Sequence, residues 1–373
     1  MRIAIDARMY GKGVTGIGTY VQNLTDYIFQ LDQNNDYYLF LLPENFDKFN
    51  PPHSKIHKIK TTAKWYSYQE QTQLLFELNK YKFDLVHFPH FNAPIFYNRP
   101  RIHTIHDITP KFFPGHKQKS WYRKKAYELT IKTGLKKSKI VITDAENTKK
   151  DLIEHFQLSS AKIAVVNLGI ENEFKVSENY DKIKEVRAKY QISKPFIFYT
   201  SAWRSHKNFE GLIQAFDLFK KQTQLDYQLV LGGEEDPFYL NISKEIAKAE
   251  SKKDIIAPGF IPDTDLPLIY NAASLYVFPS FYEGFGFTGL EAMACGTPVI
   301  SSNRSCLPEI YEQAALYFDP ENIAEITAQM KKVLTDQDLE QELITKGFQQ
   351  IKKYSWQQCA QQTLAIYQQA LKQ

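Results

Sequence analysis

Short apolar runs with strand-like character alternate with longer helix-like runs along the whole chain of 373 residues. Such alternation is typical of parallel α/β layers, because two parallel strands need a crossover connection that is usually a helix. The length suffices for two domains of ordinary size, each with its own core. The pattern therefore predicts an α/β protein made of two such domains.

The expected elements form two series. In the first half, helices are expected at 17–31, 68–81 and 120–137, and strands at 2–7, 37–42, 84–89, 102–106, 139–143 and 163–167. In the second half, strands are expected at 196–200, 228–231, 254–257, 275–278 and 298–301. The polar stretch 171–191 is interpreted as the interdomain link together with a first helix.

One nine-residue run, Glu283–Glu291, carries the strongest functional signal. It follows an expected strand and leads into an expected helix, and three glycines lie between its terminal carboxylates. Glycines let backbone N–H groups approach a ligand closely, and a helix N-terminus favours bound anions. Carboxylates accept hydrogen bonds from sugar hydroxyls. The run therefore predicts a site for a nucleotide sugar.

Two other interpretations of the glutamates remain open. Thr288-Gly289-Leu290-Glu291 also fits a capping box, in which Glu291 only caps the helix. The two glutamates could instead form a glycosidase acid/base pair. In one continuous helix they would lie about 12 Å apart, beyond the roughly 5–9.5 Å that such pairs need. A turn between them would weaken that objection.

The longer pattern Pro-Ser-x-x-Glu-Gly-Phe-Gly-x-x-x-x-Glu-Ala-Met-Ala-x-Gly-x-Pro-Val-Ile resembles the signature of retaining GT-B glycosyltransferases. This large family (family 4 type) includes bacterial mannosyl- and glucosyltransferases. The resemblance covers nearly the whole chain and implies two Rossmann-like domains that face a deep cleft. The acceptor-side domain would comprise 1–172, joined by the C-terminal helix 355–373, and the nucleotide-sugar-binding domain 173–354.

The resemblance also implies roles within the nine-residue run. Glu283 is expected to contact the donor sugar as a catalytic residue, and Glu291 to bind the ribose hydroxyls. Backbone amides at the start of the helix are expected to hold phosphate, at Gly286, Phe287 and Thr288.

Two basic residues, Arg204 and Lys207, follow the strand at 196–200. Arg offers a planar fork and Lys a compact charge, so together they can stabilise a departing diphosphate. Lys207 matches the phosphate-binding lysine of the family, whereas many relatives place their arginine nearer the strand than Arg204. The alternative is that both are surface charges at a helix start. Phe260 falls where relatives seat the nucleotide base.

The glycine-rich loop after the first strand formally contains Gly-x-Gly-x-x-Gly, beginning at Gly11. Its distance from the strand is greater than the dinucleotide-binding fingerprint allows, and the first acid after the next strand, Glu44, comes too late. The loop more closely resembles the family's first loop, Gly16–Tyr20. Gly16 and Gly18 are therefore predicted to line the donor phosphate or the acceptor, and NAD is not expected.

Histidines end two of the expected strands. His106 resembles the family histidine near the reacting carbon of the sugar, and Asp107 is expected on the acceptor side, orienting His106 or the acceptor. A structural strand-end histidine is the alternative. His87 and His90, three residues apart on a strand, would point to opposite faces, so the pair is interpreted as structural or cleft-lining rather than metal-binding.

Two Asp-x-Asp triplets, Asp263–Asp265 and Asp336–Asp338, raise a metal site as an alternative. Both lie in expected loops or at a helix start, where Asp is favoured as a cap. Cys295, Cys306 and Cys359 show no paired metal spacing and indicate a reduced cytoplasmic protein. Neither a metal nor a cofactor is expected, and the donor is a substrate.

Basic and aromatic residues are concentrated in 111–139, where ten Lys or Arg accompany the single acid Glu128. On one helix they suit the surface of an anionic membrane. The equal alternative is a solvated helix whose aromatic residues belong to the core. No apolar run reaches the roughly 18 residues of a spanning helix. The chain is thus expected in the cytoplasm, with peripheral membrane contact as a hypothesis and no nucleic acid partner.

These features together predict a retaining hexosyltransferase that moves a sugar from a nucleoside diphosphate to a glycan or lipid-linked acceptor. Asp6-Ala7-Arg8 and Gly16–Tyr20 resemble bacterial mannosyltransferases of surface polysaccharide assembly, which makes GDP-mannose the first donor expected. A GT-B sugar phosphorylase or epimerase remains an alternative. So does a protein that binds nucleotide sugars without turnover.

Overall fold

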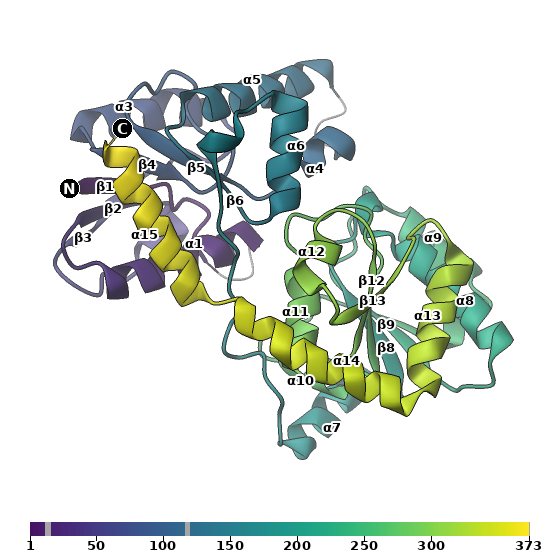
Figure 1. Cartoon of the computed structure of the whole chain (residues 1–373). Helices are drawn as coiled ribbons and strands as arrows, with labels where there is room; N and C mark the ends of the chain where they lie inside the picture. Colours follow the sequence, from purple (N-terminus) through teal and green to yellow (C-terminus); the bar gives the residue numbers. More distant parts are fainter. Residues whose placement is uncertain (12–15, 116–119, 373) are drawn as a thin grey trace. The chain divides into compact units, whose positions relative to one another are not determined.

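The structure is a computed structural model that describes residues 1–11, 16–115 and 120–372. The chain divides into two compact units (Figure 1). Unit 1 comprises Met1–Gly169 and Ser355–Gln373, and unit 2 comprises Ile170–Tyr354. The sequence analysis places this boundary after residue 172.

Unit 1 is built on a parallel sheet which, among the described residues, has seven strands in the order β3-β2-β1-β4-β5-β6-β7. The strands are β1 (Arg2–Ile5), β2 (Asp36–Leu41), β3 (Ile56–Lys60), β4 (Leu85–Phe88), β5 (Arg101–Ile105), β6 (Val141–Thr143) and β7 (Ile163–Val165). The α-helices are α1 (Gly16–Leu31), α2 (Pro43–Phe46), α3 (Leu75–Tyr81), α4 (Thr109–Phe112), α5 (Trp121–Lys137), α6 (Glu146–Phe156) and α15 (Trp356–Lys372). A π-helix, η1 (Glu70–Leu74), runs directly into α3, and a 3-10 turn, η3 (Ser160–Lys162), precedes β7.

The central strands of this sheet are buried because helices cover both of its faces, as parallel sheets require. Every residue of β4 and β5 is buried. The last helix, α15, packs on α1 within unit 1 (Figure 1). Its Tyr367 hydroxyl is hydrogen-bonded to His87 Nδ1 on β4 at 2.7 Å. This is the position that the family resemblance implies for the C-terminal helix.

Unit 2 repeats the plan with a parallel sheet of six described strands in the order β10-β9-β8-β11-β12-β13. These are β8 (Phe196–Thr200), β9 (Gln228–Gly232), β10 (Ile255–Gly259), β11 (Leu275–Phe278), β12 (Val299–Ser302) and β13 (Ala315–Phe318). The α-helices are α7 (Tyr180–Lys189), α8 (Phe209–Gln222), α9 (Asn241–Lys248), α10 (Leu266–Ala272), α11 (Phe287–Ala294), α12 (Leu307–Tyr311), α13 (Ile323–Thr335) and α14 (Gln337–Gln350). Short 3-10 turns are η4 (Ser205–Lys207), η5 (Lys252–Asp254) and η6 (Ile351–Lys353).

Each sheet has a point at which the order of its strands reverses. In unit 1 this point lies between β1 and β4, and in unit 2 between β8 and β11. Open α/β sheets bind ligands outside the carboxyl ends of the strands at such points. The loops that follow these four strands are therefore the expected ligand-binding segments.

The observed elements differ from the expected ones mainly at the sheet edges. Strands β3 and β13 were not among the expected strands, and both lie at an edge of their sheet. The single helix expected at 68–81 is the π-helix η1 followed by α3. In the part of the chain that the structure describes, no helix combines the length and the apolar character needed to cross a bilayer.

Candidate functional site

An ion pair joins the two predicted loops of unit 2. Lys207 ends η4 after β8, and Glu283 lies in the loop after β11. The Lys207 Nζ lies 2.8 Å from each carboxylate oxygen of Glu283. The two side chains are only 17% and 12% exposed, so the charges interact with little screening by solvent. Two residues far apart in the sequence thus meet at the point where the strand order reverses.

The loop that carries Lys207 is fixed by Asn208, which adopts a left-handed conformation with a φ of +54°. Its side-chain oxygen accepts a hydrogen bond from Gly211 N and so caps α8. Its amide nitrogen donates to the carbonyl oxygens of Pro279 and Pro320, at 3.1 and 2.8 Å. These bonds tie the Lys207 loop to the segment that leads to Glu283.

Tyr311 explains two of the three glycines of the nine-residue run, Gly286 and Gly289. The Tyr311 hydroxyl donates a 2.6 Å hydrogen bond to the carbonyl oxygen of Gly286. A Cβ atom on Gly286 would lie 2.6 Å from that hydroxyl, and one on Gly289 would overlap the same ring. Gly286 also has a φ of +93°, which side chains rarely tolerate. The glycines therefore let the backbone turn closely into α11.

Glu291 does not close a capping box. Helix α11 begins at Phe287 and its N-cap is Gly286, so Thr288 lies inside the first turn. The Glu291 carboxylate instead accepts a 3.0 Å hydrogen bond from the Tyr270 hydroxyl. Burial raises the pKa of Glu291 to about 8, although the Tyr270 hydrogen bond opposes the shift. Burial therefore favours the protonated form of this carboxyl group.

Arg204 and Phe260 are less enclosed than the ion pair. Arg204 is exposed at the residue before η4. Burial lowers the pKa of His206 to about 3, and the Lys207 and Arg204 charges add to this shift. Phe260 follows β10, the edge strand of the sheet, and its side chain is 56% exposed. Both residues follow strands of the same sheet and lie at the same edge as the ion pair, but their side chains are exposed to solvent.

In unit 1, His106 is held by acceptors on both ring nitrogens. Its Nδ1 lies 2.6 Å from the Asp144 carboxylate, and its Nε2–H donates to the Pro89 carbonyl oxygen at 2.9 Å. Burial lowers the pKa of His106, but the Asp144 carboxylate outweighs this effect and the net shift is upward. The edge of the Tyr20 ring packs on the imidazole, with centroids 4.7 Å apart. The arrangement favours an imidazolium cation.

The carboxylate that hydrogen-bonds to His106 is Asp144, not Asp107, and the expectation that Asp107 orients the acceptor stays a prediction. The Asp107 carboxylate accepts a 2.7 Å hydrogen bond from the backbone N–H of Thr109, at the start of α4. The sequence analysis missed Asp144. The position of Asp144 directly after β6 could have identified it. Strands β5 and β6 are parallel neighbours, so the residues that follow them, His106 and Asp144, meet at one edge of the sheet.

The two predicted loop glycines differ in their surroundings. Gly16 begins α1, is exposed, and a Cβ there would meet no atom within 4 Å. Gly18 is buried, and a Cβ there would lie 2.7 Å from the Met9 carbonyl oxygen. Packing against the preceding backbone thus requires glycine at position 18, and its ligand-lining role stays a prediction. Residues 12–15 of this loop lie outside the described residues.

The Asp-x-Asp triplets have structural partners. Asp265 pairs with Lys189 Nζ at 2.6 Å, and Asp336 caps α14 through Leu339 N at 3.0 Å. His87 is buried between Tyr367 and Thr104, away from His90. Across residues 1–11, 16–115 and 120–372, no three His, Cys, Asp or Glu side chains are grouped in a way that could hold a metal ion.

Two known protein families match this chain, one in each half. Residues 182–350 match the family described as glycosyl transferases group 1, and residues 14–174 match glycosyltransferase family 4. The O-antigen chain mannosyltransferase B of Escherichia coli is 31% identical over 295 residues, which cover 78% of this chain and 75% of that protein. The chain is a family 4 glycosyltransferase.

A second relative of this glycosyltransferase is a much longer protein. The serotype-specific mannosyltransferase WbdA of E. coli is 32% identical over 215 residues, 57% of this chain. The match covers 26% of WbdA, so the chain corresponds to about a quarter of that protein.

Solved structures show the same architecture over the whole length. A sucrose-phosphate synthase from Thermosynechococcus elongatus has a TM-score of 0.77 at 20% identity and covers 99% of this chain and 98% of its own. HepE of Anabaena, solved in complex with UDP and glucose, also has a TM-score of 0.77, at 16% identity, and covers 99% of this chain and 100% of its own. The enzyme thus has the GT-B fold of two Rossmann-like domains.

Proposed function

We propose that this glycosyltransferase transfers mannose from GDP-mannose to a growing surface polysaccharide, with retention of configuration. Relatives named as O-antigen chain mannosyltransferases in E. coli and Salmonella typhimurium support the sugar and the type of acceptor. The acceptor would be a glycan or a lipid-linked glycan.

The Lys207–Glu283 ion pair is the observation that carries this proposal. In the free enzyme the lysine ammonium group is held by a carboxylate at 2.8 Å. A sugar diphosphate offers both groups new partners, because its phosphate attracts the ammonium and its hydroxyls donate to the carboxylate. Arg204, exposed beside this pair, would add a second cation. Lys207 and Arg204 would then stabilise the charge on the departing diphosphate.

The remaining donor contacts follow from the surrounding elements. Helix α11 begins at Phe287 beside Glu283, and the partial positive charge of a helix N-terminus favours phosphate near Phe287 and Thr288. Glu291 would accept hydrogen bonds from the ribose hydroxyls. The exposed Phe260 ring would stack on the nucleotide base.

In unit 1, His106 is the proposed partner of the transferred sugar. Its imidazolium, held by Asp144, would stabilise negative charge near the reacting carbon. Asp107 is retained as an acceptor-side candidate, and Gly16 as a candidate for contact with the donor phosphate or the acceptor, because both lie at the carboxyl edge of the first sheet. No metal is required in this scheme, since the cationic side chains neutralise the leaving phosphate, which itself would accept the proton of the acceptor hydroxyl.

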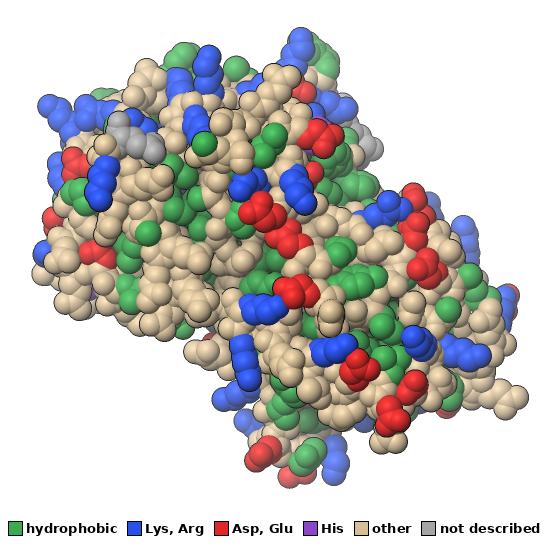
Figure 2. All heavy atoms as spheres, in the orientation of Figure 1, with side chains coloured by type: hydrophobic (Ala, Val, Ile, Leu, Met, Phe, Trp, Pro, Cys, Tyr) green, Lys and Arg blue, Asp and Glu red, His purple; other side chains and the backbone are tan. Residues whose placement is uncertain are grey.

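We also propose that α5 contacts an anionic membrane. One face of α5 belongs to the core, through Tyr127, Ile131 and Leu135. The other face exposes Trp121 and Tyr122, and Lys125 Nζ lies 5.3 Å from the Trp121 ring centre. Basic and hydrophobic side chains meet at this edge of unit 1 (Figure 2). Exposed aromatic residues among lysines suit the headgroup region of an anionic bilayer.

The donor is tested by thermal shift with GDP-, UDP-, ADP- and TDP-sugars, followed by assay of nucleotide release in the presence of an acceptor glycan. GDP-mannose is expected to raise the melting temperature most, because at equal concentration the ligand with the lowest Kd stabilises the folded state most. Stronger stabilisation by another nucleotide sugar would overturn the choice of donor. A product of inverted anomeric configuration, seen by NMR, would overturn retention.

A further inference from the structure

A small polar pocket lies where the strand order of the first sheet reverses, and the roles assigned above do not use it. Asp6 and Arg8 follow β1, His90 and Asn92 follow β4, and Trp65 lies in the loop after β3; all five line the pocket. We call it the β1–β4 pocket. Such a position at the carboxyl edge is where open α/β sheets place ligands.

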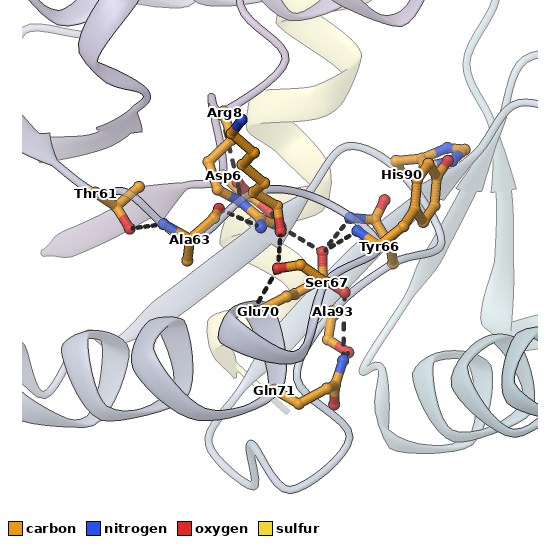
Figure 3. A network of polar contacts seen from close by, with 12 residues as sticks. Asp6, Arg8, Thr61, Ala63, Tyr66, Ser67, Glu70, Gln71, His90 and Ala93 are labelled. Atoms are coloured by element: carbon orange, nitrogen blue, oxygen red, sulfur yellow. Dashed lines mark hydrogen bonds and ion pairs between the residues drawn. The ribbon is translucent and has the colours of Figure 1, made fainter.

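Arg8 forms the fixed frame of the β1–β4 pocket (Figure 3). It is 1% exposed and makes two 2.7 Å bonds to the Asp6 carboxylate, through Nε and Nη2. Nη2 also donates to Glu70 at 2.9 Å, and Nη1 donates to the Ala63 carbonyl oxygen at 3.0 Å. Every guanidinium nitrogen therefore has a protein partner, and Arg8 is not available to hold an anion.

The charges of this frame select against anionic ligands. One guanidinium is shared by the two carboxylates of Asp6 and Glu70, which are 8% and 2% exposed. The buried group as a whole is thus negative. A phosphate or carboxylate beside it would be repelled, whereas hydroxyl groups would be accepted.

Asn92 supplies an unused acceptor. Its amide nitrogen donates a 2.6 Å hydrogen bond to Glu70, which fixes the orientation of the amide. Its Oδ1 atom is buried and has no hydrogen-bond partner among the described residues, and the whole side chain is 4% exposed. A buried acceptor without a donor is costly. A ligand hydroxyl in the pocket would satisfy it.

The size and walls of the pocket indicate what part of a ligand enters. Its enclosed volume of about 10 Å³ has room for one hydroxyl-sized group. Trp65 forms one wall, and the adjacent Tyr66 hydroxyl lies 2.6 Å from His90 Nε2. Tyr66 is held at a φ of +59°, an unusual conformation for a tyrosine. An aromatic wall beside a few polar groups is typical of small-molecule sites.

We infer that the β1–β4 pocket is the acceptor subsite and takes an uncharged hexose. One hydroxyl of the hexose donates to Asn92 Oδ1, and the ring lies against Trp65. The inference deepens the proposed function, because it defines the acceptor terminus as a neutral sugar rather than a phosphorylated one.

The inference is tested by saturation-transfer NMR on the full chain without donor. The probes are the methyl hexosides of mannose, glucose and galactose, with mannose 6-phosphate as the charged counterpart. At least one methyl hexoside is expected to bind, and mannose 6-phosphate to bind more weakly. Trp65→Ala and Asn92→Ala should each weaken hexoside binding by about tenfold, the loss expected for one contact to a buried group. Tyr68→Ala is the matched control and should bind as the parent does, because Tyr68 is 82% exposed and does not line the pocket.

Three results would overturn the inference: no hexoside binds, mannose 6-phosphate binds more tightly than the hexosides, or Trp65→Ala binds as the parent does. The first would mean that the pocket holds only water. Because Trp65 is partly exposed, its variant keeps the test valid even where Asn92→Ala fails to fold. Failure of GDP-mannose turnover would instead reject the proposed function, because hexoside binding is measured without donor.

Discussion

The polar clusters at the two sheet edges differ in their balance of charge. In unit 2, Lys207 is matched by the single carboxylate of Glu283, and Arg204 is exposed beside them. In unit 1, Arg8 is shared by two carboxylates and fully bonded. Similar sheets thus present one edge suited to a diphosphate and one suited to hydroxyls. The chemistry of each site comes from a few side chains, not from the fold they share.

The largest expected effect concerns the cation of unit 2. Lys207→Met should lower kcat by about 10²–10³-fold, the usual cost of removing one group that stabilises charge in a transition state. Lys220→Met is the matched control, because Lys220 is similarly enclosed and pairs with Asp226 and Asp254 at the end of α8. Full activity in Lys207→Met, measured as nucleotide release, would show that Lys207 does not stabilise the departing diphosphate.

The second prediction tests whether the cation of unit 1 is His106. Asp144→Asn should destabilise the protein by about 3 kcal/mol in urea unfolding, because it removes one partner of a buried ion pair. The pKa of His106 lies above its ordinary value, so this stabilisation is fully present below the unfolded-state pKa and is lost as pH rises through the folded-state pKa. The difference between variant and parent should therefore shrink at alkaline pH.

The control for this experiment is the exposed pair of His57 and Asp36. Asp36→Asn should change stability by about 0–1 kcal/mol, as surface pairs do. Equal losses in Asp36→Asn and Asp144→Asn would show that burial does not strengthen the His106 pair.

The third prediction concerns Glu291 in unit 2. Its pKa of about 8 lies above the ordinary value of 4.5, so the carboxyl group is protonated in the free enzyme at neutral pH. Ribose hydroxyls donate to the ionised form, so binding of GDP should release a proton. The affinity for GDP should then rise by up to about tenfold per pH unit below pH 8 and level off above it. In calorimetry, Glu291→Gln should remove this pH dependence, and an unchanged profile would exclude the ribose role.

The same shift has a consequence for the free enzyme. Because the folded-state pKa of Glu291 is raised, its contribution to stability is present below pH 4.5 and is lost as pH rises through about 8. The melting temperature of the parent should fall across this range more steeply than that of Glu291→Gln. Parallel curves would contradict the raised pKa.

The smallest effect is expected at the surface of unit 1. Lys125→Gln should weaken binding to vesicles containing phosphatidylserine by about fivefold, since one basic residue near an anionic surface contributes about 1 kcal/mol. Lys332→Gln, an equally exposed lysine on α13, is the control. Binding of the parent to phosphatidylcholine vesicles as strongly as to anionic ones would reject the membrane proposal.

Most of the fold could be predicted because buried parallel strands are continuous apolar runs. Strands β8 and β11 begin and end at the residues expected for them. The missed strand β3 lies at a sheet edge and mixes apolar with basic residues, so its apolar character is diluted. The other missed strand, β13, also lies at an edge but is a short apolar run of four residues, which periodicity alone does not distinguish from a helix segment. The π-helix η1 was missed because its residues have the periodicity of an ordinary helix.

The candidate site could be predicted where its signal is local. Lys207 and Glu283 each lie in a short segment that follows a strand, so each was identified before their contact was known. The sequence did not point to Asp144, Glu70 or Asn92, because the role of each depends on a hydrogen-bond partner from a distant segment. Nothing near Glu70 in the sequence indicates that it bonds to Arg8, which lies 62 residues earlier.

The role proposed for Lys207 is to hold the distal phosphate of the donor nucleotide. The most direct test is calorimetric titration of GDP and GMP into the parent and Lys207→Met proteins. The parent is expected to prefer GDP to GMP by at least about tenfold, or roughly 1.4 kcal/mol, and Lys207→Met is expected to lose this preference while keeping its affinity for GMP. An undiminished preference for GDP in Lys207→Met would contradict it.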